Sequence, residues 1–144
     1  MGRLGPEVGW GPVELRARDD PLFNDLPDQL TVLHWHGDTY ERPPGAVLLA
    51  TNATYREQAF RCGPRAWGLQ FHIEVDRRAI DNFLQAFGDD VAAGGTTPDA
   101  IAAASSAAIT ALTPYRTRVL ERFARLVAAD EPLVGEQGRL AELA

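Results

Sequence analysis

Two short segments contain all three histidines of the 144-residue chain. One spans residues 34–39 (HWHGDT) and the other spans residues 68–74 (GLQFHIE). In the second segment His72 and Glu74 are two residues apart, so on an extended strand both side chains lie on the same face. A carboxylate beside an imidazole fixes the tautomer of the ring, orients it and stabilises its protonated form. The pair fits a general acid/base with its orienting group, and it fits equally a strand-end histidine followed by a helix cap.

Taken together, the two segments resemble the class I glutamine amidotransferases. Residues 68–74 are similar to the Gln-Phe-His-x-Glu motif that closes the glutaminase domain of GMP-synthase-type enzymes, where proline most often stands at the position of Ile73. Residues 34–39 resemble the Ser/His-His-Gly-Asp segment of that family, and residues 7–10 (EVGW) resemble the strand before it. The resemblance covers roughly residues 7–129.

The resemblance implies a glutaminase mechanism built on a Cys-His-Glu triad. In the family a cysteine thiolate attacks the side-chain amide of glutamine, the histidine protonates the departing ammonia, and the glutamate orients the histidine. By motif match, His72 is the acid/base and Glu74 is its orienting group. His36, Gly37 and Asp38 match the segment that binds the substrate glutamine. No cofactor and no metal are implied.

The nucleophile of that mechanism is not found by pattern in this chain. In the family it lies in a Gly-x-Cys-x-Gly turn upstream of the strand that residues 7–10 resemble. The single cysteine, Cys62, lies in FRCGP, which is typical of a hairpin arm. We therefore expect the C-terminal half of an amidotransferase domain, inactive alone and completed by an N-terminal half that carries the cysteine. The alternative is a non-catalytic remnant of this fold that binds a partner.

A metal-binding interpretation also fits the first segment. His34 and His36 lie two residues apart and are followed by Glu41, which resembles the first metal motif of the cupin barrels. Residues 63–72 supply a histidine but neither the asparagine nor the spacing of the second cupin motif. The cupin-like metal-binding protein therefore remains the weaker alternative.

The elements that position these residues divide the chain in two. Alternating and short apolar runs predict strands, and after Asp76 the apolar residues recur at helical spacing. The predicted strands span residues 5–15, 29–35, 46–50, 58–62 and 66–72. Asp76, Thr97–Pro98 and Thr113–Pro114 are predicted to begin three helices, with a glycine-rich loop over residues 88–97. The expected fold class is α/β, with mixed or antiparallel strands followed by three helices in a domain of residues 1–130, and residues 131–144 form a polar tail.

Composition excludes several classes of protein. A net charge of −6 with no lysine argues against nucleic-acid binding and excludes Schiff-base and P-loop chemistry. No apolar stretch exceeds five residues, whereas a membrane-spanning helix needs about 20. One cysteine allows no internal disulfide, and no signal peptide is visible, so a reducing, cytoplasmic setting is expected.

The expected partners are glutamine and either an N-terminal half-domain or an ammonia-accepting synthase. Loss of half a domain would uncover a sheet edge and an apolar face. We therefore expect the isolated chain to oligomerise or aggregate, with residues 46–50 and the strand ending at His72 laid bare.

Overall fold

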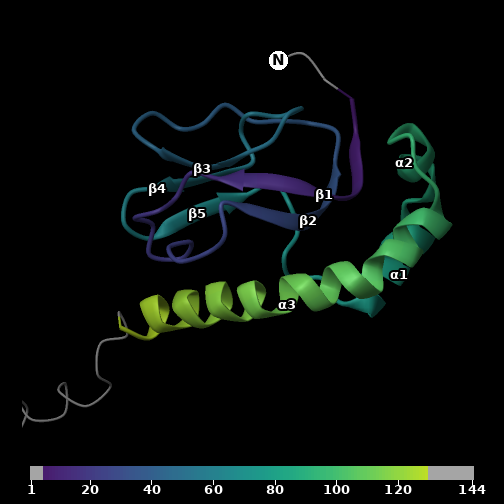
Figure 1. The fold of residues 1–144 in the computed structure, drawn as a ribbon. Helices are drawn as coiled ribbons and strands as arrows, with labels where there is room; N and C mark the ends of the chain where they lie inside the picture. Colours follow the sequence, from purple (N-terminus) through teal and green to yellow (C-terminus); the bar gives the residue numbers. More distant parts are fainter. Residues whose placement is uncertain (1–4, 130–144) are drawn as a thin grey trace, which may run out of the picture.

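The computed structural model describes residues 5–129, which form an antiparallel sheet followed by helices (Figure 1). The strands are β1 (Glu7–Leu15), β2 (Gln29–His36), β3 (Val47–Thr51), β4 (Ala59–Cys62) and β5 (Ala66–Leu69). The helices are α1 (Arg77–Ala86), α2 (Gly88–Ala93) and α3 (Pro98–Ala128). The sheet order is β2-β1-β3-β4-β5, and every strand pair is antiparallel. The predicted fold class is confirmed, whereas the predicted tail 131–144 lies outside the described residues.

The pairing of β1 with β2 decides which polar side chains meet. The two strands pair over their whole length, so that Glu7 lies opposite His36 and Gly9 lies opposite His34. In the first half of β2, Leu30 and Val32 are buried while Gln29 and Thr31 on the other face are exposed, and from Leu33 onward both faces are covered. Because side chains alternate, Glu7 shares a face of the sheet with His36 and, on the diagonal, with His34.

The segment after β5 returns to β2 at the far edge of the sheet. The predicted strand 66–72 ends at Leu69, but His72 and Leu33 exchange both backbone hydrogen bonds, at 2.8 and 3.3 Å. The backbone bridge from His72 to Leu33 links the segment after one edge strand, β5, to the other edge strand, β2, so the sheet is curled. This bridge brings residues 68–74 beside residues 34–39, which are far apart in sequence.

The two predicted caps at Asp76 and Thr97 are confirmed. The Asp76 carboxylate accepts from the Ala79 amide at 2.8 Å, and the Thr97 hydroxyl accepts from the Ala100 amide at 3.2 Å. The predicted loop 88–97 is wrong in its first half, which forms the short helix α2.

Thr113–Pro114 does not begin a new helix, which corrects the third predicted boundary. α3 runs unbroken for 31 residues, and the Thr113 hydroxyl bonds back to the Ile109 carbonyl at 2.7 Å instead of capping. Proline inside a helix costs about 3 kcal/mol, which must be offset by packing on either side. Leu112 and Val119 flank Pro114 and are both buried. No helix among the described residues is long and apolar enough to cross a membrane.

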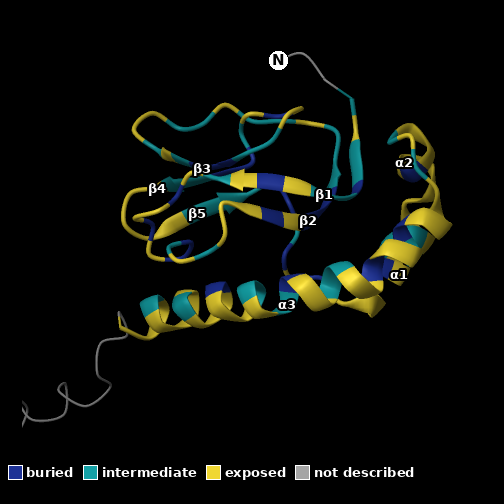
Figure 2. Cartoon of the chain, in the orientation of Figure 1, coloured by how far each residue is buried: buried dark blue, intermediate teal, exposed yellow. Residues whose placement is uncertain are grey.

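The long helix α3 runs along the sheet, and α1 and α2 pack near its N-terminal half (Figure 1). One apolar cluster joins the three helices to β2, and its buried members are Leu33, Val75, Ile80, Val91 and Ile101. The outward side of α3 is exposed, including three apolar residues near its end, Leu120, Phe123 and Val127 (Figure 2). The prediction that residues 46–50 are laid bare holds only for part of the segment: β3 lies inside the sheet, where Leu49 and Ala50 are buried, whereas Val47 is exposed.

Candidate active site

His72 and Glu74 form a hydrogen-bonded pair where the sheet gives way to α1. His72 Nδ1 lies 2.6 Å from Glu74 Oε1. The backbone of His72 is fixed by its bridge to Leu33, and the ring packs edge-on against Phe83 of α1, with centroids 5.3 Å apart. The Glu74 side chain is 59% exposed and that of His72 is 29% exposed. The pair is therefore positioned by packing and remains open to solvent.

The hydrogen bond sets the electrostatics of this pair. The bond from His72 holds the pKa of Glu74 below its usual range, and partial burial opposes that shift. A carboxylate at this distance is best satisfied by a proton on Nδ1, which leaves Nε2 free to accept or donate a proton. The arrangement can perform general acid/base chemistry.

The predicted binding segment, His36, Gly37 and Asp38, lies beside this pair. The Asp38 carbonyl accepts from the Gln70 side chain at 3.2 Å, and it lies 3.2 Å from His36 Nδ1. The three residues line a cavity of about 350 Å³ that Trp35 and α2 also border, and His72 is not among its lining residues. The structure connects the segment to His72 through Gln70 and the backbone, not through one shared cavity.

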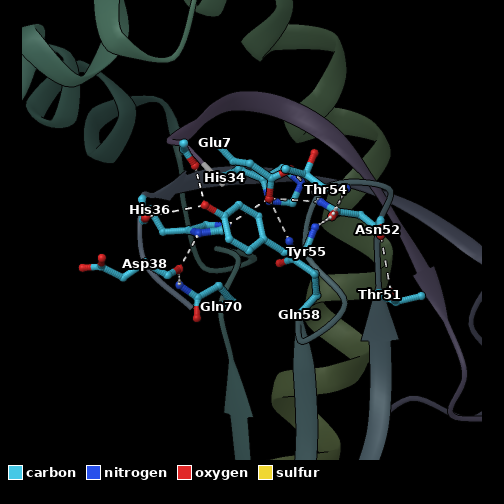
Figure 3. Close-up of polar contacts among 12 residues, drawn as sticks. Glu7, His34, His36, Asp38, Thr51, Asn52, Thr54, Tyr55, Gln58 and Gln70 are labelled. Carbon is cyan, nitrogen blue, oxygen red and sulfur yellow. Dashed lines mark hydrogen bonds and ion pairs between the residues drawn. The ribbon is translucent and has the colours of Figure 1, made fainter. Parts of the chain in front are cut away.

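A second group of polar side chains comes from β1, β2 and the segment between β3 and β4 (Figure 3). The sequence pattern did not predict that these side chains lie together. Glu7 Oε2 lies 3.1 Å from His36 Nε2 and 3.7 Å from His34 Nδ1. The same carboxylate accepts from the Asn52 side chain at 2.9 and 3.1 Å and from the Gln58 side chain at 2.8 Å. The sequence signal that could have revealed this group was Glu7, a charged residue directly before a run of six uncharged strand residues (VGWGPV).

His34 is the most enclosed member of this group. It is 4% exposed; neither ring nitrogen makes a well-formed hydrogen bond, although the ring lies against the backbone of Gly11 and Pro12. Burial lowers the pKa of His34, and the nearby charge of Glu7 partly opposes that shift. Tyr55 encloses the neighbouring His36, with ring centroids 5.0 Å apart, and its hydroxyl donates to the Gly5 carbonyl.

Known proteins similar to this chain are glutamine-dependent enzymes. The GMP synthase (glutamine-hydrolyzing) of Porphyromonas gingivalis is 35% identical over 89 residues, which cover 57% of this chain and 18% of that protein. A glutamine amidotransferase structure from Thermotoga maritima is 33% identical, with a TM-score of 0.75, over 85% of this chain and 52% of the other. A glutamine amidotransferase structure from Methylobacillus flagellatus, 20% identical with a TM-score of 0.77, shows the same fold over 87% of this chain and 54% of the other. No protein-family model matches the chain.

The sequence matches and the structural matches point to the same family. The chain is similar to part of the class I glutamine amidotransferase domain. It spans about half the length of the solved amidotransferases and less than a fifth of the P. gingivalis GMP synthase. The amidotransferase fold replaces the cupin-like alternative. Glu41, its expected metal ligand, is exposed and lies outside the Glu7–His34–His36 group.

An amidotransferase of this class needs a thiol beside its histidine, and Cys62 does not lie there. Cys62 is exposed at the turn end of the β4–β5 hairpin, where it pairs with Ala66. Ala66 is the first residue of β5, and His72 lies beyond its last residue, Leu69, so Cys62 and His72 lie toward opposite ends of this strand. The structure therefore does not bring Cys62 and His72 together as a pair.

Proposed function

We propose that the chain supplies the acid/base part of a glutamine amidotransferase, which hydrolyses the side-chain amide of glutamine once a segment bearing a cysteine nucleophile completes the site. The observation that carries this proposal is the His72–Glu74 hydrogen bond of 2.6 Å at the end of the sheet. Glu74 orients the ring through Nδ1, and Nε2 of His72 is the nitrogen left for proton transfer. The similarity to glutamine amidotransferases supplies the reaction class.

The chemistry follows from the tautomer. Nε2 takes the proton of the incoming cysteine thiol, and the thiolate attacks the amide carbon of glutamine. The resulting imidazolium gives that proton to the departing ammonia as the carbon–nitrogen bond breaks. His72 then removes a proton from the water that hydrolyses the thioester, and glutamate is released with the thiol restored. Glu74 stabilises the imidazolium in both steps without itself taking the proton.

Substrate and partner follow from the same proposal. His36, Gly37 and Asp38 hold the glutamine, with Gln70 fixing the Asp38 carbonyl on the side of His72. The released ammonia passes to a synthase domain or subunit; the P. gingivalis relative is named a glutamine-hydrolyzing GMP synthase. A reducing cytoplasm would keep the required thiol reduced.

A non-catalytic, partner-binding role is the second candidate. The position of Cys62 favours it, because the described residues provide no thiol near His72. Under this alternative the His72–Glu74 pair is a structural link between β2 and α1. A catalytic assay of the completed domain separates the two candidates.

The test combines this chain with the nucleophile-bearing segment of a related amidotransferase and measures ammonia released from glutamine. We expect no release by the chain alone and release by the complex that co-elutes on a sizing column. His72→Gln should lower the rate by about 10³-fold, a typical contribution of general acid/base catalysis. Cys62→Ser is the matched control and should leave the rate unchanged. Release by the chain alone that Cys62→Ser abolishes, or a co-eluting complex that is inactive, would contradict the proposal.

A further inference from the structure

The buried group of Glu7, His34 and His36 contains nitrogen atoms that lack partners. Nδ1 of His34 and Nε2 of His36 are buried within reach of Glu7 without a well-formed hydrogen bond, whereas the other nitrogen of His34, Nε2, faces the backbone near Gly11. Buried polar atoms in native proteins are almost always paired with protein, water or an ion. Two imidazole nitrogens beside one carboxylate without such a bond therefore require an explanation.

The hydrogen bonding of His36 helps to decide what lies between these nitrogens and Glu7. Its Nδ1 lies 3.2 Å from the Asp38 carbonyl, which can only accept, so Nδ1 carries a proton. In the neutral ring, Nε2 then presents a lone pair to Glu7 Oε2 at 3.1 Å, which is repulsive. Protonation of His36 would remove this repulsion, but it would leave Nδ1 of the buried His34 without a hydrogen bond. A cation held between the three side chains accepts a lone pair from His34 Nδ1 and one from His36 Nε2, while Nε2 of His34 directs its proton at the backbone of Gly11 and Pro12.

The distances fit such a cation. In a tetrahedral site with ligands at about 2.0–2.1 Å, neighbouring ligand atoms lie about 3.3 Å apart. The separations of Glu7 Oε2 from the two histidine nitrogens are 3.1 and 3.7 Å, and the three ligand atoms lie within 4.8 Å of one another. The ligands come from directly paired strands, since Glu7 lies opposite His36 in the β1–β2 register.

The surroundings also match a metal site. Histidine ligands usually donate their second N–H to a carbonyl or carboxylate, as His36 does to Asp38. The carboxylate ligand is oriented by hydrogen bonds from the Asn52 and Gln58 side chains (Figure 3). Nε2 of His34 faces the backbone near Gly11, which leaves Nδ1 directed at Glu7.

We propose that Glu7, His34 and His36 bind one zinc-class divalent metal ion, with a water in the fourth position. Two imidazoles and one carboxylate form a donor set that suits zinc and other late first-row metals over magnesium or calcium. The ion ties β1 to β2 and, through Asn52 and Gln58, holds the loop between β3 and β4. The site does not include His72 or Glu74. It shares His36 with the proposed glutamine-binding segment, but metal binding by the three side chains does not require the proposed reaction. The amidotransferase resemblance alone implied no metal here.

The test titrates the full chain, carrying Cys62→Ser to remove the exposed thiol, with zinc after treatment with a chelator. We expect one zinc per chain and a melting temperature that rises with zinc concentration. His36→Gln should weaken zinc binding by at least about 100-fold, since it removes one of three ligands. The matched control is His72→Gln, which removes the histidine of the other histidine–carboxylate pair and should bind zinc as the parent does.

A measurement on the parent protein covers the case in which His36→Gln does not fold. Nitrogen-15 spectra of the imidazoles should show zinc-dependent shifts at Nδ1 of His34 and Nε2 of His36, with His72 unchanged. No stoichiometric zinc uptake, uptake that survives His36→Gln, or shifts confined to His72 would overturn the proposal. A His36 ring protonated at both nitrogens in the presence of zinc would show that it is an ion pair with Glu7 instead.

Discussion

The chain builds two histidine–carboxylate groups from the same residue types in opposite surroundings. At the end of the sheet, His72 and Glu74 touch at 2.6 Å in a position that water reaches. Beneath β1 and β2, Glu7 meets two histidines in a site where His34 is 4% exposed. The two groups lie close together in the fold because His72 bridges to Leu33, the neighbour of His34 on β2.

The difference between the groups lies in what surrounds each carboxylate. Glu74 has one side-chain partner and solvent, so its loss removes an orienting contact and little stability. Glu7 accepts hydrogen bonds from the Asn52 and Gln58 side chains, which lose a partner with it, and lies 3.1 and 3.7 Å from the nitrogens of two imidazoles. An exposed pair is suited to exchanging protons with a substrate, whereas a buried group is suited to holding strands, or an ion, in place.

The largest expected effect is at the buried carboxylate. Glu7→Ala should lower the free energy of unfolding by about 2–4 kcal/mol, because it leaves buried amide donors unpaired. Urea unfolding in the presence of a chelator measures this cost without a contribution from metal. Glu14→Ala is the matched control on the same strand, since its exposed side chain pairs with Arg16 at the surface, and it should change stability by less than about 0.5 kcal/mol. If Glu7→Ala and Glu14→Ala were equally stable, the claim that the buried carboxylate of Glu7 stabilises the fold would be wrong.

A smaller effect is expected from crowding His34. A Cβ at Gly11 would lie 3.1 Å from His34 Cδ2, and His34 is too enclosed to move freely. Gly11→Ala should therefore destabilise the chain by about 1–2 kcal/mol, measured by thermal unfolding. Gly88→Ala is the control, because nothing lies within 4 Å of a Cβ at that position. A Gly11→Ala chain as stable as the parent would show that His34 is loosely held.

The smallest effect on stability is expected at the exposed pair. Glu74→Gln should lower the free energy of unfolding by no more than about 0.5 kcal/mol, because solvent screens this interaction. The pKa of Glu74 is lowered by His72, so its contribution is present above the unfolded carboxyl pKa of about 4.3 and is lost as the pH falls through the lower, folded value. Urea unfolding of the parent and variant should differ slightly at neutral pH and converge in acid. A difference that grows in acid would contradict this assignment.

Much of this arrangement could be predicted from local pattern. The spacing of His72 and Glu74 predicted a shared face, and the structure joins them by a hydrogen bond. Asp76 and Thr97 correctly predicted where two helices begin. Each side chain accepts a hydrogen bond from the backbone amide three residues later, so the cap depends only on residues within one helical turn. These features depend on residues a few positions apart.

The features that sequence reasoning missed depend on long-range packing. Thr113–Pro114 has the same local pattern as Thr97–Pro98, but burial of Leu112 and Val119 keeps α3 continuous through the proline. Glu7 joins His34 and His36 because the register of β1 and β2 places them together, and no short-range pattern specifies a register. Glu41, which is near His36 in sequence, is exposed and lies outside this group for that reason.

The most direct test of the account is a double-mutant cycle at the exposed pair in the completed amidotransferase, measured as kcat/KM for glutamine. If Glu74 acts through His72, Glu74→Gln alone slows hydrolysis by about 10–100-fold, and it has no further effect in the His72→Gln background. Comparable zinc content and melting temperature across the four proteins would show that the buried group is intact. Equal, independent losses in both backgrounds would contradict the account, since Glu74 would then act without His72.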